Sequence, residues 1–494
     1  AERALSVPSP SKTDLRPTAP ARSPEPSIAV LPFRTVGGNA ESEYFSEGMT
    51  EDVIAALSSV PGLRVAARTS SFAFQGKNED VRRIGNDLGV ATVLDGSVRQ
   101  VGQRLRVTAQ LIDVASGYNL WSERWDRELA DVFAVQDEIA RAIARTLQAR
   151  LPTSSGSQSS NPAQSGAPLA APGTRDVGAY DRYLKGRYLW NRRRLHEAIV
   201  EFDAAVERDP DFEEAHTVLS EAWAMWGFYG GVPTWESWAR ARAAADRAEE
   251  IAPDAASLPL CRGVLEYYYG WNLARTERSF RLAIEGDPAN AEARFWLALT
   301  LAPTLRTEES LASAREAVRL EPHSANNRTA VGWPLLMAGR DEEAAVELAA
   351  AAEIGGSPFA LWSYGSALSA LGRHGEAIEA HRHAVELTGG RYTYYSALLG
   401  NALALDGRRD EARAILRELD AHQYVPPFDR AVVLTGLGED AAALDALEQA
   451  YRERNAYLWA RILFPQLRRL RGAPGFRALA ARLAHRAPIR PLDA

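Results

Sequence analysis

A unit of about 34 residues recurs along residues 180–450 of this chain. A small residue marks each unit, and most successive marks lie 33–35 residues apart, at Ala198, Ala241, Thr276, Ser310, Ala344, Ala377, Ala412 and Ala443. Two short antiparallel helices and their turns use about this many residues, which is the tetratricopeptide spacing. We therefore predict an all-α superhelical solenoid over residues 177–486, with about eight repeats plus capping helices. The alternative is an alanine-rich bundle with accidental spacing.

Other positions recur in the same register. Glycine recurs inside the first helix of a pair, where we expect backbone to meet backbone, at Gly186, Gly263, Gly332, Gly365 and Gly400. Proline follows the second helix, which it cannot continue, at Pro210, Pro253, Pro288 and Pro322. An insertion at residues 227–235 lengthens one turn, and Pro334 is expected to kink or shorten the first helix of the fifth unit.

The first part of the chain has a different pattern. Residues 27–151 alternate short apolar runs with helical periodicity, which predicts an α/β domain with a mixed sheet in the order β-α-β-α-β-β-β-α. Residues 1–26 are rich in Pro, Ser and Ala and predict a disordered linker. Residues 152–176 predict a flexible Pro/Ser/Gly-rich linker that lets the folded parts move relative to each other. Residues 487–494 are expected to fray.

Several short motifs lie in this α/β part. Residues 28–33 are Ile-Ala-Val-Leu-Pro-Phe, residues 63–70 are Leu-Arg-Val-Ala-Ala-Arg-Thr-Ser, and residues 94–99 are Leu-Asp-Gly-Ser-Val-Arg. These segments resemble the TolB-like amino-terminal domain, which precedes tetratricopeptide repeats in many bacterial signalling proteins. Near the other end, Tyr-Val-Pro-Pro-Phe at 424–428 and Tyr-Arg-Glu-Arg-Asn at 451–455 resemble the last repeats of the same group.

The resemblance implies the regulatory half of a larger protein. In such proteins the output domain lies upstream and is a serine/threonine kinase, a class III nucleotide cyclase or a winged-helix domain. The chain begins without Met and reads as a piece cut on its N-terminal side. The resemblance also leaves room for a homo-oligomer through the TolB-like domain.

No catalytic, cofactor-binding or metal-binding set emerges from the sequence. Gly76-Lys77 lacks the rest of a phosphate loop, and His381 and His383 diverge on one helix. Cys261 is interpreted as a small buried hydrophobe. We therefore expect a protein that is not an enzyme and that needs no cofactor.

Charge and hydropathy limit the partners. The net charge of −7 gives no global basic field for nucleic acid, and the run Arg192-Arg193-Arg194 is interpreted as a solvated turn. No apolar run approaches the roughly 20 residues that span a bilayer, so membrane contact would need an upstream segment. The localisation stays open, with the cytoplasm slightly favoured.

Binding in a concave groove is the leading functional hypothesis. Aromatic and arginine side chains favour protein interfaces, and the register predicts these groove residues: Tyr183, Arg187, Trp190, Asn191, Tyr267, Tyr268, Asn326, Trp333, Trp362 and Asn401. They would bind a peptide or protein partner and make the chain a protein-interaction and regulatory module. Some of these aromatics could instead only pack between repeats. The second hypothesis is a small-molecule or nucleotide sensor with a pocket near Arg68, Thr69 and Ser70.

Overall fold

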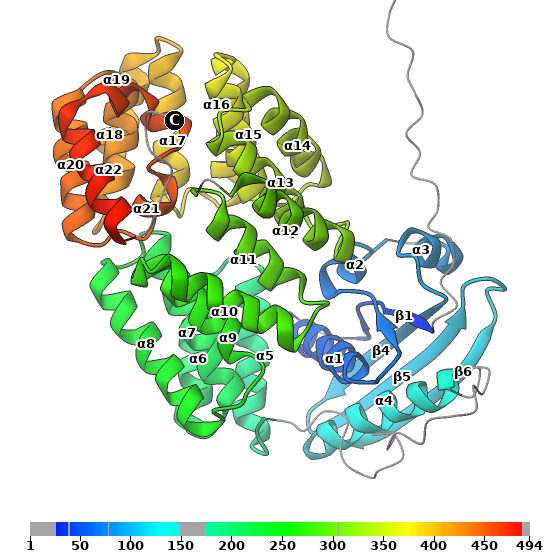
Figure 1. Cartoon of the computed structure of the whole chain (residues 1–494). Helices are drawn as coiled ribbons and strands as arrows, with labels where there is room; N and C mark the ends of the chain where they lie inside the picture. Colours follow the sequence, from blue (N-terminus) through cyan, green and yellow to red (C-terminus); the bar gives the residue numbers. More distant parts are fainter. Residues whose placement is uncertain (1–25, 38–39, 78, 149–172, 305, 487–494) are drawn as a thin grey trace, which may run out of the picture.

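The computed structural model describes residues 26–37, 40–77, 79–148, 173–304 and 306–486. Figure 1 shows an α/β part, coloured blue to cyan, beside a larger helical part that runs from green to red. The predicted combination of a mixed sheet and a large helical region is thus confirmed. The N-terminal linker, nearly all of the second linker and the C-terminal tail lie outside the described residues.

The sheet of the α/β part combines parallel and antiparallel pairing. Its order is β3-β1-β4-β5-β6: β1 is parallel to β3 and β4, β2 pairs in parallel with β4, and β4, β5 and β6 form an antiparallel meander. The strands are β1 (Ser27–Val30), β2 (Arg34–Thr35), β3 (Arg64–Val65), β4 (Thr92–Val101), β5 (Arg104–Asp113) and β6 (Asn119–Glu128). The helices are α1 (Ala40–Ser58), α2 (Arg68–Phe72), α3 (Val81–Asp87), the 3-10 turn η1 (Leu129–Asp131) and α4 (Val132–Gln148). The short β2 and α2 are additions to the predicted order.

Alternation along the strands fixes which face of the sheet is buried. In β5, Leu105, Val107 and Ala109 point to one face, as period-two geometry requires, and all are buried. They share a core with α1 and α4, which pack against each other on that face. A smaller cluster of Ala29, Val93 and their neighbours forms a second core.

Among the described residues, α5 to α20 form eight consecutive helix pairs. They are α5 (Val177–Asn191) with α6 (Leu195–Arg208); α7 (Glu213–Phe228) with α8 (Thr234–Ile251); α9 (Leu258–Leu265) and the π-helical turn η3 (Glu266–Gly270) with α10 (Leu273–Gly286); α11 (Ala291–Leu301) with α12 (Thr307–Leu320); α13 (Ala325–Met337) with α14 (Asp341–Ile354); α15 (Pro358–Ala370) with α16 (His374–Leu387); α17 (Thr393–Leu405) with α18 (Arg409–Asp420); and α19 (Pro427–Leu437) with α20 (Asp440–Arg452). Pro334 does not shorten α13, which continues to Met337.

The recurring glycines lie under side chains, not against the partner backbone as we expected. A Cβ on Gly263 would lie 2.4 Å from the ring of Phe280, and one on Gly332 would lie 2.4 Å from Leu348. Each large residue comes from the second helix of its own pair and rests on the glycine of the first helix. The absent Cβ therefore leaves room for a side chain that closes the pair.

The last helices do more than cap the array. Residues 455–472, here named the C-terminal segment, include α21 (Leu458–Arg461) and the 3-10 helix η4 (Pro465–Gly472). This segment lies against the first helices of several pairs: Phe464 packs on Trp333 with ring centroids 5.0 Å apart, and Gln466 donates a hydrogen bond to Ser366 at 2.7 Å. The following helix α22 (Pro474–Arg486) packs on α20 at the end of the array, in the manner of a cap.

The α/β part packs on the helical part through α1 and α5. Glu51 of α1 forms ion pairs with Arg187 of α5 and with Arg68 of α2. Its neighbour Asp52 accepts hydrogen bonds from the Tyr180 hydroxyl and, at 2.9 Å, from Gln136 of α4. The structure therefore holds together two parts that the linker composition alone left free to move.

A glycine exchange tests the packing of the helix pairs. In Gly263→Ala the new methyl group must displace the Phe280 ring, so we expect a loss of about 1–3 kcal/mol in the free energy of unfolding. The control is Gly375→Ala in α16, where a Cβ would meet nothing within 4 Å and where alanine should be neutral or stabilising. Urea unfolding followed by circular dichroism measures both. Equal effects would contradict the packing explanation.

The contact between α1 and α5 should respond to pH. Burial raises the pKa of Asp52 from 3.8 to about 6. Because this pKa is higher in the folded state, the stability that the group contributes is full below pH 3.8 and is lost as the pH rises through about 6. The difference in the free energy of unfolding between Asp52→Asn and wild type should therefore shift in favour of the variant by up to about 3 kcal/mol from pH 4 to pH 7. A difference that is independent of pH would contradict the assignment.

Candidate ligand cavity

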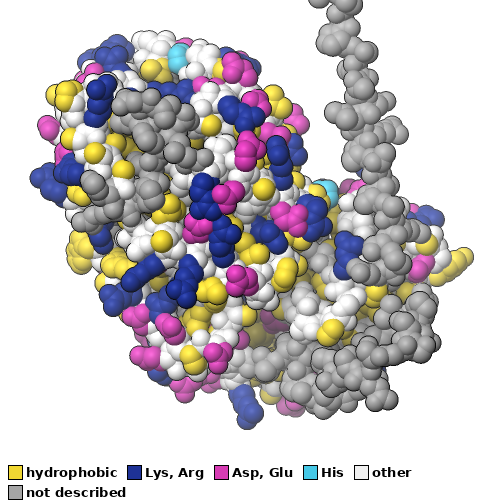
Figure 2. All heavy atoms as spheres, viewed as in Figure 1, with side chains coloured by type: hydrophobic (Ala, Val, Ile, Leu, Met, Phe, Trp, Pro, Cys, Tyr) yellow, Lys and Arg dark blue, Asp and Glu magenta, His cyan; other side chains and the backbone are white. Residues whose placement is uncertain are grey.

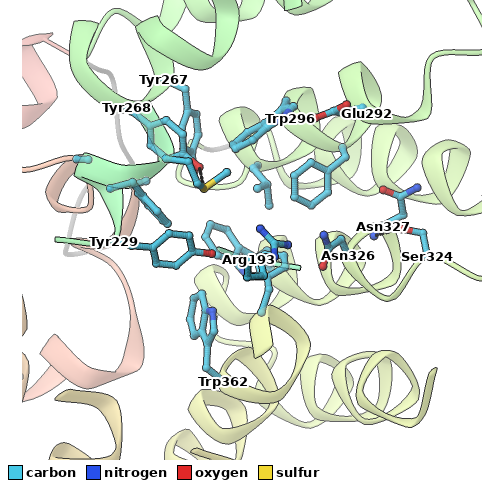
Figure 3. Close-up of a pocket in the computed structure, with 18 of the residues that line it drawn as sticks. Arg193, Tyr229, Tyr267, Tyr268, Glu292, Trp296, Ser324, Asn326, Asn327 and Trp362 are labelled. Carbon is cyan, nitrogen blue, oxygen red and sulfur yellow. Dashed lines mark hydrogen bonds between the residues drawn. The ribbon is translucent and has the colours of Figure 1, made fainter. Parts of the chain in front are cut away.

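A cavity of about 350 Å³ lies in the helical part, where several pairs, the C-terminal segment and α2 meet. Figure 3 shows part of its lining. Its walls come from α2, α5, α7, η3, α11, α13, α15, α17 and α21. Pockets for small molecules typically have volumes of about 300–1,000 Å³, with apolar walls and a few convergent polar groups. The volume of this cavity lies in that range, and its lining combines aromatic side chains with a few polar groups.

Nearly half of the residues that line the wall are aromatic. The π-helical turn η3 directs Tyr267 and Tyr268 toward the cavity, where both contact Trp296 with ring centroids 5.3 and 5.5 Å apart. Figure 3 shows these three rings on one side of the cavity, with Tyr229 and Trp362 around it. Single π-helical turns inside helices often occur at functional sites. The third tyrosine, Tyr269, points away and donates a hydrogen bond to the carbonyl oxygen of Ala224 at 2.7 Å.

Arg461 of α21 reaches the cavity from within a cage of rings. Its guanidinium carbon lies 4.4–5.5 Å from the centroids of five aromatic rings, those of Phe228, Trp333, Trp362, Tyr394 and Tyr457. The residue is 4% exposed, and its Nε and Nη1 have no hydrogen-bond partner among the described residues. The rings favour the cation, but they do not accept the hydrogen bonds that its N–H groups can donate.

Arg193 enters the cavity from the turn after α5. Its backbone is left-handed, with φ of 58°, and its own carbonyl oxygen accepts a hydrogen bond from the Tyr392 hydroxyl at 2.6 Å. In Figure 3 its side chain points into the space between the aromatic rings and the asparagines. No ion pair joins Arg193 or Arg461 to an acidic residue in the part of the chain that the structure describes.

Acidic and amide groups form the opposite end of the cavity. Thr69 of α2 donates a hydrogen bond to Glu321 at 2.8 Å, and Asn327 donates to the same carboxylate oxygen at 3.3 Å. Burial raises the pKa of Glu321, and it also raises the pKa of Glu292 nearby. Thr69 places the α/β domain at the edge of the cavity.

The structure brings seven of the ten predicted groove residues to this cavity: Trp190, Asn191, Tyr267, Tyr268, Asn326, Trp333 and Trp362. The other three do not line it. Arg187 pairs with Glu51 of the α/β domain, Tyr183 packs on Phe212 with centroids 5.0 Å apart, and Asn401 donates a hydrogen bond to the Val432 carbonyl oxygen. Their face of α5 and α17 is used for packing.

The aromatic residues do not form an open groove. Trp333 and Trp362 are 1% and 2% exposed because Arg461 and Phe464 of the C-terminal segment cover them. Of the alternative pocket residues, Thr69 lines the cavity, whereas Arg68 pairs with Glu51 and Ser70 is buried.

The three arginines at residues 192–194 have three different environments. Arg192 pairs with Glu43 and Glu47 of α1, and Arg194 pairs with Glu197 at the start of α6. Only Arg193 enters the cavity, so the solvated-turn interpretation was wrong for this residue. On the face seen in Figure 2, acidic and basic side chains are interspersed over the helical part.

The remaining sequence candidates for chemistry are packing residues. Cys261 is fully buried, and burial raises the pKa of its thiol to about 12. His381 rests on Gly365, and burial lowers its pKa to about 3. Within the described ranges, no group of three or more His, Cys, Asp or Glu residues is arranged to hold a metal ion.

Parts of the sequence are similar to known proteins. Residues 24–142 match the family described as HilA/YgeH-like transcriptional regulator, second domain. The chain is 42% identical over 207 residues to "Putative adenylate cyclase 3" of Rhizobium meliloti (strain 1021), which covers 41% of this chain and 33% of that protein. The chain therefore spans about a third of the length of this curated relative.

Two solved structures are similar to part of this chain. PilF of Pseudomonas aeruginosa is 17% identical with a TM-score of 0.32, and covers 43% of this chain and 92% of its own. MamA is 19% identical with a TM-score of 0.26, and covers 40% of this chain and 94% of its own. Because these TM-scores are low, the assignment of helix pairs rests on the repeat and the structure of this chain.

No helix among the described residues is both long and apolar enough to cross a membrane. The repeated helix pairs, together with the regulator domain matched at residues 24–142, support a protein-interaction or regulatory module.

Proposed function

We propose that this chain is a non-enzymatic regulatory module of a larger bacterial signalling protein, and that it binds its ligand in this cavity. The observation that carries this proposal is that the cavity is shared: helices from both halves of the array, the C-terminal segment and Thr69 of the α/β domain all line it. A ligand there would contact every part of the module at once. Its binding energy can therefore change how these parts pack.

A ligand in the cavity would act on an output domain through the α/β domain. We propose that it is TolB-like and that a kinase, cyclase or winged-helix domain lies upstream. The match to a transcriptional regulator's second domain and the partial similarity to a protein named as a putative adenylate cyclase support this organisation. The 2.8 Å hydrogen bond from Thr69 of this domain to Glu321 joins it to the cavity wall.

The second candidate is a protein partner that takes the place of the C-terminal segment. This segment is held as a bound peptide would be, through the Gln466–Ser366 hydrogen bond, the Trp459 indole N–H donating to the Tyr267 carbonyl oxygen, and two contacts of 2.6 and 2.7 Å between Arg468 and Asp341. A partner with similar anchors could bind after the segment leaves.

A thermal-shift screen of small metabolites tests the cavity proposal. A ligand at one hundred times its Kd should stabilise the folded chain by about 2.7 kcal/mol. Ala460→Leu, which adds bulk at the cavity wall, should remove this stabilisation while the variant still unfolds cooperatively. The proposal fails if no metabolite stabilises the chain, or if the variant is stabilised as strongly as wild type.

A labelled peptide of residues 455–472 tests the second candidate. It should bind a Gln466→Leu, Arg468→Leu double variant more tightly than wild type, because the variant's own segment has lost its polar anchors. Fluorescence anisotropy measures both affinities. Equally weak binding to the two proteins would exclude displacement of the segment as the mode of regulation.

A further inference from the structure

We propose that the cavity binds a small organic anion that carries a planar ring, with its anionic group on Arg461 and Arg193 and its ring among the aromatic side chains. This inference rests on the proposed function and adds the chemical class of the ligand. A carboxylate or a phosphate satisfies the same two guanidinium groups. The experiment below separates these two sources of charge.

The first argument is the state of Arg461. A buried charged group is normally paired, because removing it from water is costly. Here Nε and Nη1 have no partner, and Arg461 forms no ion pair within the described residues. The acidic residue that acts on it is Asp429, which lies beyond ion-pair distance and itself accepts a hydrogen bond from Thr393 at 2.7 Å. Arg461 lines the cavity, so an anion there would supply the counter-charge that the described residues do not.

The second argument is the place of Arg193 in its repeat. The residue at the same turn, just after the first helix of a pair, has positive φ in six other repeats; it is Trp271 in the third repeat and glycine in five: Gly230, Gly339, Gly372, Gly407 and Gly438. Glycine adopts this conformation freely, whereas a residue with a Cβ adopts it at an energetic cost. In the first repeat the chain accepts this cost at Arg193, whose side chain reaches the cavity. Strained backbone of this kind clusters at binding sites.

The third argument is the shape and lining of the space. About 350 Å³ is near the lower limit for ligand pockets, so it suits one or two rings with a short polar arm. Tyr229, Tyr268 and Trp296 offer ring faces and edges to a planar group. At the far end, Glu321 already accepts two hydrogen bonds, and burial raises its pKa and that of Glu292. The cationic groups among the described lining residues are the guanidinium groups of Arg193 and Arg461.

The test compares matched anions and neutral analogues on the full chain. Benzoate and AMP are titrated by calorimetry beside benzamide and adenosine, which keep the rings and lose the charge, and beside inorganic phosphate, which lacks a ring. We expect benzoate or AMP to bind at least about tenfold more tightly than its neutral analogue, as hydrogen bonds to a charged group imply. If benzoate binds more tightly than AMP, the anionic group of the ligand is a carboxylate. If AMP binds more tightly, it is a phosphate.

Variants assign the binding to the two arginines. Arg193→Asn should fold well, because asparagine tolerates positive φ, and should weaken the anion about tenfold or more while leaving the neutral analogue unchanged. Arg461→Met should do the same. The control is Arg454→Asn, which also replaces an arginine with positive φ, in this case 53°, beside Trp271 and outside the cavity. If Arg461→Met does not fold, Arg193→Asn alone decides.

The outcomes separate this inference from the proposed function. Equal binding of anions and neutral analogues, or an Arg193→Asn variant that keeps the affinity of wild type, overturns the anion inference and leaves a cavity for another ligand class. Failure of every probe, with stabilisation by a different neutral metabolite in the thermal screen, also overturns it. If nothing binds and nothing stabilises the chain, both proposals fall.

Discussion

The packing of the C-terminal segment against the first helices of the array determines the rest of this structure. Without that segment, the rings of Trp333, Trp362 and Tyr267 would face water in the interior of the array. Aromatic burial of this extent is a large favourable contribution to stability. The same packing divides the interior into a filled part and a remaining cavity, so the fold and the candidate site have one physical origin.

Much of the architecture could be predicted from the sequence because it depends on local periodicity. Helix pairs follow from spacing and turn residues, and buried strands such as β5 follow from alternation. The role of the glycines was predicted less well. Their spacing shows that something must come close, but whether it is a backbone or a side chain such as Phe280 is decided by the partner helix.

Site residues whose position follows from the repeat register could be predicted from the sequence. Residues that are placed by contacts between distant segments could not. The repeat register indicates which helical face points inward, and most of the predicted groove residues reach the cavity. Arg187 does not, because the α/β domain packs on its side of α5. Arg193 could have been noticed, because five of the other repeats have glycine at the corresponding turn. Arg461 carried none, since no local pattern shows that a terminal segment folds back onto the repeats.

The two contacts of the α/β domain have a mechanical consequence. The domain meets the first pair through Glu51 and Arg187, and it meets the end of α12 through Thr69 and Glu321. The α/β domain therefore bridges the first and the fourth helix pairs. Neighbouring repeats can change their relative orientation by small rotations. A rotation between the pairs that lie between these two contacts would have to lengthen or break one of them, so the α/β domain restrains such rotations.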